Sequence, residues 1–321
     1  MEKKNNANVK KIVIAVVAVI LIVGAVILTK FFIDKSNSDG GVTNSTPTQD
    51  LTETTEPEPK PDYSEYVAKN PETVGWISVP GTGVDFPVVQ TDNNEYYMNY
   101  NFDNKSDYRG AIFMDKNNDA LNLDSNTVIY GHNNYKDGVV FSDLAQYEDI
   151  EFYKEHPVIE FNTLDKYYKW KIYAVIHTNR LPKEDNGYVF NYIYPHNFEG
   201  VNYDGYVTEL NKRTLYFTGV DVKEGDKFLT LQTCVRNFDI SGNSKYPHNY
   251  TSGGSSYYRA QGGIVIIARA VRPGEDPTVD TSKAYINENP KYPQIYYDKH
   301  GITNPFKNDV QWKPKAVEVK K

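Results

Sequence analysis

The chain has 321 residues, of which 39% are hydrophobic and 24% charged, which is enough for one sizeable globular core with accessory segments. Its formal net charge of −7 gives no basic field to attract phosphates, and the sequence contains no nucleic-acid-binding motif. Nucleic acid is therefore excluded as an expected partner. The sequence also has no glycine-rich phosphate loop and no His or Cys cluster with metal-ligand spacing, so we expect neither a cofactor nor a metal.

An uncharged aliphatic run extends from Ile12 to Thr29 near the N-terminus. At about 1.5 Å per residue such a helix nearly crosses a ~30 Å hydrocarbon layer. Lys30 and two phenylalanines follow the run, instead of the small residues of a signal cleavage site. Four lysines precede it, and positive flanks stay on the cytoplasmic side. We therefore predict a cytoplasmic segment at residues 1–11, an uncleaved transmembrane signal anchor at 12–33 in the lipid bilayer, and an extracellular remainder.

The rest of the chain divides into three parts by composition. Residues 34–61 are rich in Thr, Ser, Glu and Pro, which predicts an extended disordered spacer that holds the folded part away from the membrane. Residues 62–271 form the expected folded domain. Residues 272–321 are a C-terminal extension without sustained periodicity, and the sequence leaves open whether it is disordered or lies across the domain.

The folded domain is expected to consist mainly of short strands, each bounded by Gly, Asn, Asp or Pro. The predicted strands are 74–79, 84–89, 111–114, 127–130, 158–161, 167–176, 227–235 and 264–271. Eight strands favour a closed barrel, with a sandwich as the alternative, because closure hides strand edges. Helices are expected at 63–70 and across 201–210, with further turns at 141–147 and 151–155. The predicted fold class is thus mainly β, with helical insertions.

Cys234 is the chain's single cysteine and has no partner for an internal disulfide. On that fact alone, a buried core residue and a nucleophile are equally good interpretations. Residues 228–236, FLTLQTCVR, alternate as a half-buried strand does, and Cys234 stands at its end, just before a loop. Reactive side chains are commonly exposed at strand ends, whereas a core cysteine more often lies mid-strand. The pattern favours a nucleophile, whose thiol needs a basic or cationic neighbour from elsewhere in the chain.

His132 is the best candidate partner among the six histidines. It follows the segment VIYG, so it stands at the end of another strand, directly after a glycine that lets the backbone turn. The others precede a proline, as His156 does, or lie in polar loops. A lone histidine is more often a surface residue than a catalytic one, and the strand-end position is what distinguishes His132.

Three segments resemble the sortases, the transpeptidase family of Gram-positive cell surfaces, and class B most closely. Residues 230–234, TLQTC, match the family's nucleophile motif Thr-Leu-x-Thr-Cys, and residues 128–132, VIYGH, match its histidine segment. NPETVGWI at 70–77, with FPVVQ at 86–90, is similar to the start of a class B barrel. The resemblance covers about residues 70–271, and the long helical insertion before the cysteine strand also fits class B.

The resemblance implies a closed eight-stranded barrel with a groove, and a specific reaction. Cys234 would attack the carbonyl of a Thr in the C-terminal sorting signal of a surface protein, and an amine of the peptidoglycan peptide would resolve the thioacyl enzyme. His132 would protonate the leaving amine, and an arginine after the cysteine would stabilise the oxyanion. Asn94, Met98 and Gln232 are the substrate contacts carried over, although turn formation and barrel packing explain each of the three equally well.

The arginine is where the sequence departs from the family. Sortases place it at the start of the last strand, where this chain has Gly263. Arg259 approaches that strand from the same side and is our first choice. Arg236 is the alternative, because two residues along a strand would put it on the same face as Cys234, roughly 6–7 Å away. Arg269 is third, because it lies well inside the strand.

Two other functions remain open from the sequence. A surface cysteine peptidase or peptidoglycan hydrolase would share the cysteine and histidine but give the acyl group to water. In papain-like hydrolases the cysteine precedes the histidine, whereas here His132 comes first, so chain order argues against that alternative. A non-catalytic adhesion module would need neither residue.

Overall fold

The computed structural model describes residues 60–134, 139–194 and 201–315. The predicted cytoplasmic segment, the transmembrane anchor and nearly all of the spacer lie outside the described residues. Within the described ranges, no helix is both long and apolar enough to cross a membrane.

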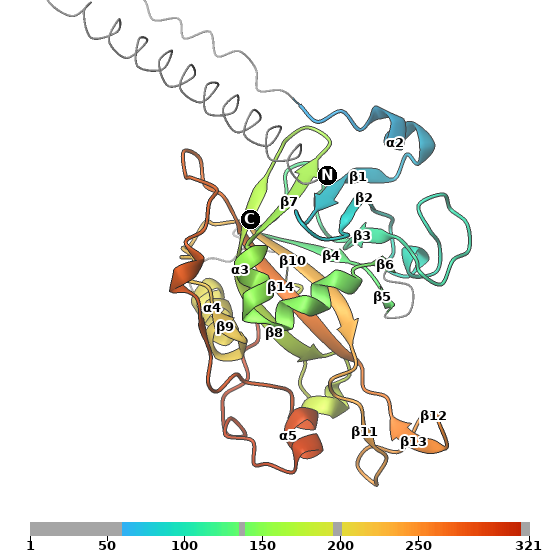
Figure 1. Cartoon of the computed structure of the whole chain (residues 1–321), viewed down its shortest axis with the longest axis vertical. Helices are drawn as coiled ribbons and strands as arrows, with labels where there is room; N and C mark the ends of the chain where they lie inside the picture. Colours follow the sequence, from blue (N-terminus) through green and yellow to red (C-terminus); the bar gives the residue numbers. More distant parts are fainter. Residues whose placement is uncertain (1–59, 135–138, 195–200, 316–321) are drawn as a thin grey trace, which may run out of the picture. The chain divides into compact units, whose positions relative to one another are not determined.

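Eight strands form a closed barrel in the order β1-β2-β3-β4-β10-β14-β8-β7 (Figure 1). Pairing of β1 with β7 closes the ring. The strands are β1 (Thr73–Ser78), β2 (Asp85–Val89), β3 (Ile112–Met114), β4 (Asn126–Tyr130), β7 (Val158–Thr163), β8 (Lys169–Asn179), β10 (Phe228–Val235) and β14 (Gly262–Ala270). Each one overlaps a predicted segment, so the mainly β fold with a closed eight-stranded barrel is confirmed.

The residues of β14 alternate between two hydrophobic cores. Ile264, Ile266 and Ala268 point into the barrel, where they join the main core. Val265 and Ile267 point outward into a second core. This period of two follows from the strand's pleat, and because both faces are covered the whole strand is apolar.

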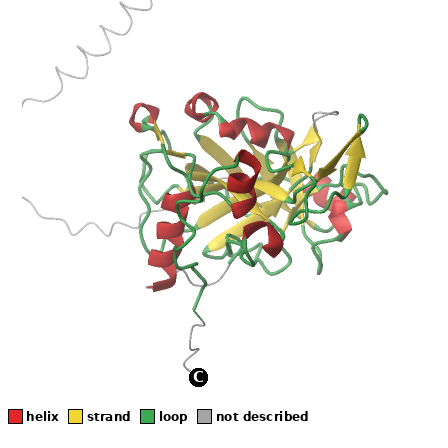
Figure 2. Cartoon of the chain, turned by 90° about the horizontal axis from the view of Figure 1, so that it is seen from below, coloured by secondary structure: helices red, strands yellow, loops and turns green. Residues whose placement is uncertain are grey.

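Helices lie around the outside of the barrel (Figure 2). They are α2 (Ser64–Lys69), α3 (Ile150–Glu155), α4 (Val201–Arg213) and α5 (Gln294–His300), with 3-10 turns η1 (Tyr96–Met98), η2 (Ser142–Glu148), η3 (Pro182–Asp185) and η4 (Thr281–Lys283). The sequence predicted α2, α3, α4 and η2, and it missed α5. Tyr206 and Leu210 of α4, which are one helical turn apart, cover the outward core of β8 and β14.

Short strands complete the fold in three small sheets. The insertion between β10 and β14 forms a three-stranded sheet of β11 (Ile240–Ser241), β13 (Ser255–Tyr258) and β12 (Tyr250–Ser252). The other two are the pairs β5 (Asn133–Asn134) with β6 (Val139–Val140), and β9 (Tyr216–Phe217) with β15 (Tyr285–Ile286).

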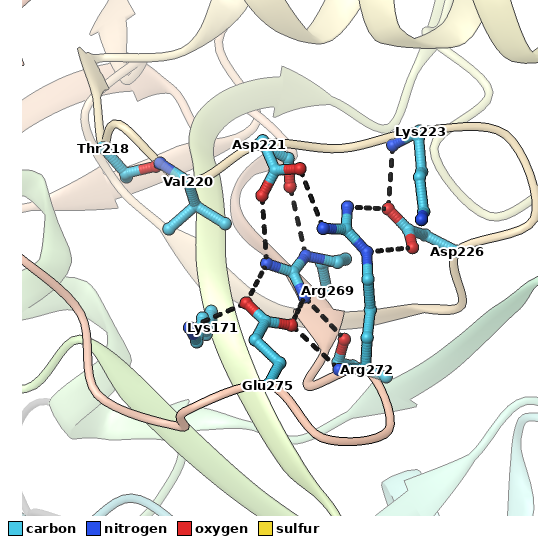
Figure 3. Close-up of polar contacts among 10 residues, drawn as sticks. Lys171, Thr218, Val220, Asp221, Lys223, Asp226, Arg269, Arg272 and Glu275 are labelled. Atoms are coloured by element: carbon cyan, nitrogen blue, oxygen red, sulfur yellow. Dashed lines mark hydrogen bonds and ion pairs between the residues drawn. The ribbon is translucent and has the colours of Figure 1, made fainter.

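The C-terminal extension leaves the barrel through an ionic network at the end of β14 (Figure 3). The Arg269 guanidinium is 1% exposed; it donates to Glu275 Oε1 at 2.8 Å, and its Nε donates to the carbonyl of Asp221 at 3.1 Å. Arg272 donates to both carboxylate oxygens of Asp226, at 2.8 and 2.7 Å. Hydrogen bonds led by the one from Arg269 hold the pKa of Glu275 well below its usual range. The network fixes the turn that directs the extension back along the barrel.

The far end of the extension docks on α4 through Trp312. A Cβ at Gly205 would lie 2.1 Å from the indole Nε1, so only glycine allows this contact. Glycine inside a helix costs about 1 kcal/mol relative to alanine, and here the indole occupies the space that a side chain would fill. Up to residue 315, therefore, the extension lies across the domain rather than apart from it.

Candidate active site

The ends of two parallel strands bring the histidine and the cysteine together. β4 and β10 are neighbours, and their last pair is Tyr130 with Gln232. His132 and Cys234 each follow two residues later, at the same end of the barrel. The sequence placed both residues at strand ends, and the parallel register explains why they meet.

Hydrogen bonds and one close contact hold these two strand ends in place. Thr233 Oγ1 donates to the carbonyl of Gly131 at 2.8 Å, and Asn133 Nδ2 donates to the carbonyl of Cys234 at 2.9 Å. A Cβ at Gly131 would lie 2.7 Å from the ring of Phe141, so a glycine is required directly before the histidine. The backbone on both sides of the site is thereby fixed.

A pocket of about 340 Å³ opens at this end of the barrel. It is lined by Asn94, Glu95, Met98, Phe113, Tyr130, Gly131, His132, Arg180, Tyr192, Gln232 and Cys234. The structure thus brings five predicted site residues together around one cavity, but neither Arg259 nor Arg236 is among its lining residues.

The imidazole of His132 is held from two sides. Its Nε2 lies 2.9 Å from the carbonyl oxygen of Met98, which can only accept, so Nε2 carries the hydrogen. On the other side, a Cβ at Gly110 would lie 3.1 Å from His132 Cδ2 and 2.4 Å from the carbonyl oxygen of Tyr97. Gly110 also has a φ of +65°, which favours glycine. With Nε2 engaged, Nδ1 is the nitrogen left for proton transfer.

Arg180 brings a cation into contact with the thiol. Its Nη1 lies 3.3 Å from Cys234 Sγ. The residue follows β8 directly, and its backbone N–H donates to the carbonyl of Gln261 at 2.9 Å, so it stands beside the start of β14. In the described part of the chain, no carboxylate forms an ion pair with it. Sequence analysis missed Arg180 because nothing in its spacing shows that β8 lies beside β14.

The three arginines considered from the sequence lie elsewhere. The Arg259 guanidinium stacks 3.8 Å from the ring centre of Tyr250, and Arg236 is exposed beyond the end of β10. Arg269 pairs with Phe228, six residues along the strand from the Cys234 pair and thus about 20 Å away. The geometry favours Arg180 over all three for contact with the sulfur.

The predicted substrate contacts differ in whether their side-chain polar atoms already form hydrogen bonds within the protein. Asn94 donates to Asp115 Oδ2 at 2.8 Å and accepts from the backbone of Lys116 at 2.9 Å. Both ends of its amide are therefore engaged in shaping the wall. Gln232 is 6% exposed, and its Nε2 has no hydrogen-bond partner among the described residues. Gln232 thus presents a buried amide donor without a partner at the wall of the pocket.

Two tyrosines in the wall stay protonated at neutral pH. Burial, which outweighs the opposing charge of Arg180, raises the pKa of Tyr192 to about 12. Burial and Asp115 raise the pKa of Tyr130 still further, and its hydroxyl donates to Asp115 Oδ2 at 2.8 Å. Within the described ranges, no three His, Cys, Asp or Glu side chains converge as metal ligands.

Comparison with protein families identifies the scaffold. Residues 77–252, more than half of the chain, match the sortase domain, and this stretch contains His132, Arg180 and Cys234. The chain belongs to the sortase family. Its curated relatives include sortase B of Listeria monocytogenes, 34% identical over 165 residues, and sortase B of Staphylococcus aureus, 31% identical over 175 residues. These sortase alignments cover 51% and 54% of this chain; the first covers 63% of the Listeria protein and the second 68% of the Staphylococcus protein.

Solved sortases of class B share the fold. A substrate complex of S. aureus sortase B superposes with a TM-score of 0.52 at 27% identity, covering 65% of this chain and 84% of that one. A protein from Bacillus anthracis similar to sortase B gives a TM-score of 0.51 at 27% identity, covering 65% and 81%. The class B resemblance read from the sequence is therefore confirmed.

Proposed function

We propose that the protein is a cysteine transpeptidase that cleaves a C-terminal sorting signal after Thr and transfers the protein to a cell-wall amine. The observation that carries the proposal is the 3.3 Å contact between Arg180 Nη1 and Cys234 Sγ, in a pocket that also holds His132. S. aureus sortase B has been solved in complex with a substrate. A sortase B has also been solved in complex with triglycine. A peptide donor and an amine acceptor on the same scaffold support this reaction class.

In the first step the Cys234 thiolate attacks the carbonyl carbon of the Thr. A C–S bond forms, and the carbonyl oxygen becomes an oxyanion that the Arg180 guanidinium stabilises. Collapse breaks the C–N bond, and a doubly protonated His132 gives its Nδ1 proton to the leaving amine while Nε2 keeps its bond to Met98. The product is a thioester on Cys234.

In the second step the amine of the peptidoglycan peptide attacks the thioester. His132 takes a proton from the amine at Nδ1, a new amide bond forms, and Cys234 leaves as the thiolate. The thioester conserves the energy of the cleaved amide, which an extracellular enzyme without ATP requires. Gln232 donates to a carbonyl of the bound signal, Met98 contacts it through its side chain, and Asn94 shapes the wall.

We also propose that the enzyme acts at the outer face of the cell membrane. Support comes from the sequence alone: an aliphatic run with lysines before it, then a polar spacer. Deleting residues 1–61 should give a soluble, active enzyme. Loss of folding on that deletion would contradict the prediction that residues 34–61 are only a spacer.

The experiment for the reaction uses the full chain in detergent and a small library of sorting-signal peptides. Mass spectrometry should find the acyl fragment on Cys234, and added triglycine should convert it to an amide product. Cys234→Ala should abolish turnover and keep the fold, as judged by circular dichroism. Full activity in that variant would show that Cys234 is not the nucleophile. Hydrolysis alone with abundant triglycine would establish the peptidase or hydrolase instead.

A further inference from the structure

A second pocket lies next to the catalytic one. It has a volume of about 540 Å³ and shares Arg180 and Tyr192 with the first pocket. One wall is the segment 187–193, and the other is 312–314 of the C-terminal extension. A ligand in this second pocket would therefore lie against the same guanidinium that contacts Cys234.

The wall supplied by the extension is built into the fold. Tyr188 donates its hydroxyl hydrogen to the carbonyl of Trp312 at 2.8 Å, and the rings of Trp312 and Phe190 lie 5.9 Å apart. Elsewhere along the extension, the backbone N–H of Gln294 donates to Asp185 at 2.8 Å. Together with the glycine that admits the indole on α4, these contacts hold the two walls in a fixed relation.

The chemistry of the second pocket favours an anionic peptide. Of the described residues that line it, Arg180 and Lys313 are the charged ones, and both are cations. They stand out in a chain with a net charge of −7. Tyr188, Phe190 and Trp312 supply aromatic surface beside them. A short peptide that ends in, or carries, a carboxylate complements this combination.

We infer that the second pocket binds the amine acceptor, a peptide that carries a free carboxylate, and that Lys313 pairs with this carboxylate. The inference rests on the proposed transpeptidase function. The donor signal must occupy the first pocket, where His132 reaches its leaving group. Once the leaving amine has departed, the acceptor amine must reach the thioester beside His132, which takes its proton. The rest of the acceptor can then extend past Arg180 into the second pocket, because both pockets share this residue.

The test compares two acceptors that differ only in charge, triglycine and triglycine amide, at saturating donor peptide. The full chain should use triglycine with the lower KM. Lys313→Glu should raise the KM for triglycine about fivefold, the size expected for an exposed ion pair, and leave the KM for the amide unchanged. The rate of thioester formation on Cys234 should not change. Lys307→Glu, an exposed charge reversal on the same extension but outside the pocket, is the matched control.

Two results would overturn the inference. If Lys313→Glu keeps the lower KM for triglycine than for triglycine amide, the second pocket does not bind the carboxylate through Lys313. A slower thioester formation with an unaltered acceptor KM would assign the pocket to the donor signal. Absence of any thioester on Cys234 in the unmodified chain would instead refute the proposed function, and this inference with it.

Discussion

Two arginines on neighbouring strands of the barrel occupy opposite kinds of environment. Arg269, inside β14, is 1% exposed and lies among the carboxylates of Glu275 and Asp221 (Figure 3). Arg180, just past the end of β8, is exposed and contacts the thiol of Cys234. β8 and β14 pair antiparallel, so the position along one pair of strands decides which partner each guanidinium meets.

The comparison separates a structural cation from one that is available for chemistry. A buried guanidinium must be paired with carboxylates, because an unpaired buried charge costs several kcal/mol. Once its N–H donors are paired with carboxylates, the guanidinium has few donors left to stabilise a new negative charge. A guanidinium that faces a thiol instead of carboxylates can stabilise the charge that develops during acyl transfer. Arg180 fits the second description and Arg269 the first.

The largest effect is expected from moving the arginine that we propose as the oxyanion donor. Arg180→Ala should lower turnover about 10²–10³-fold, the cost of losing an oxyanion donor. Gly263 pairs with Cys234, so a side chain there shares its face of the sheet. Adding Gly263→Arg to Arg180→Ala should therefore raise turnover about tenfold above that of Arg180→Ala alone. A Cβ at 263 lies 3.1 Å from Gln232 Nε2, which must shift slightly.

The control for this exchange is Gly263→Arg in the unmodified chain. Its thermal unfolding shows whether the new side chain is tolerated. If the double variant is folded but no more active than Arg180→Ala, a cation beside the thiol is not sufficient.

Breaking the structural network should cost stability and not turnover. Glu275→Gln leaves the buried Arg269 guanidinium without its main carboxylate, so the free energy of unfolding should fall by about 3 kcal/mol. Urea denaturation measures this loss, and kcat of the folded enzyme at 25 °C should stay within about twofold. Glu288→Gln, an exposed glutamate on the same extension, should leave the stability unchanged. A large fall in kcat for the folded Glu275→Gln enzyme would mean that the two ends of the strands are coupled.

The same network predicts how stability depends on pH. The pKa of Glu275 is lowered in the folded state, chiefly by Arg269, from an ordinary value of 4.5. A group with a depressed pKa stabilises the fold above its unfolded value, and this contribution is lost as the pH falls. The Tm of the unmodified chain should therefore drop more steeply below about pH 4.5 than that of Glu275→Gln. Parallel curves for the two proteins would contradict the assignment.

The smallest expected effect concerns the docking of the extension. Gly205→Ala places a Cβ against the Trp312 indole, so it should destabilise the protein by about 1 kcal/mol, although alanine is the better helix former. Thr208→Ala, on the exposed side of α4, is the matched control and should be neutral or slightly stabilising. A more stable Gly205→Ala variant would show that the extension does not dock on α4.

The strands of the barrel could be predicted because each one has its own local sequence pattern. A short apolar run such as Ile264 to Ala268, bounded by turn formers, predicts a strand without any knowledge of its neighbours. Cys234 and His132 were selected in the same way, because each lies close to the end of a strand and in a family motif. Arg180 was not, because its role depends on which strand lies beside β14, and β8 is more than 80 residues away in sequence.

The path of the C-terminal extension could not be predicted from the sequence either. It is held by single contacts, such as Trp312 against Gly205, which produce no periodic pattern. An isolated glycine inside a helix, as Gly205 is, was the one local sign of a close approach.

The most direct test of the account measures the single-turnover rate of thioester formation on Cys234 in Arg180→Ala, Arg259→Ala and Arg236→Ala. Single turnover isolates the step in which the oxyanion develops from product release and acceptor binding. We predict a loss of about 10²–10³ in Arg180→Ala and less than about threefold in the other two. A hundredfold loss in Arg259→Ala or Arg236→Ala, with Arg180→Ala near the unmodified rate, would contradict the assignment of Arg180.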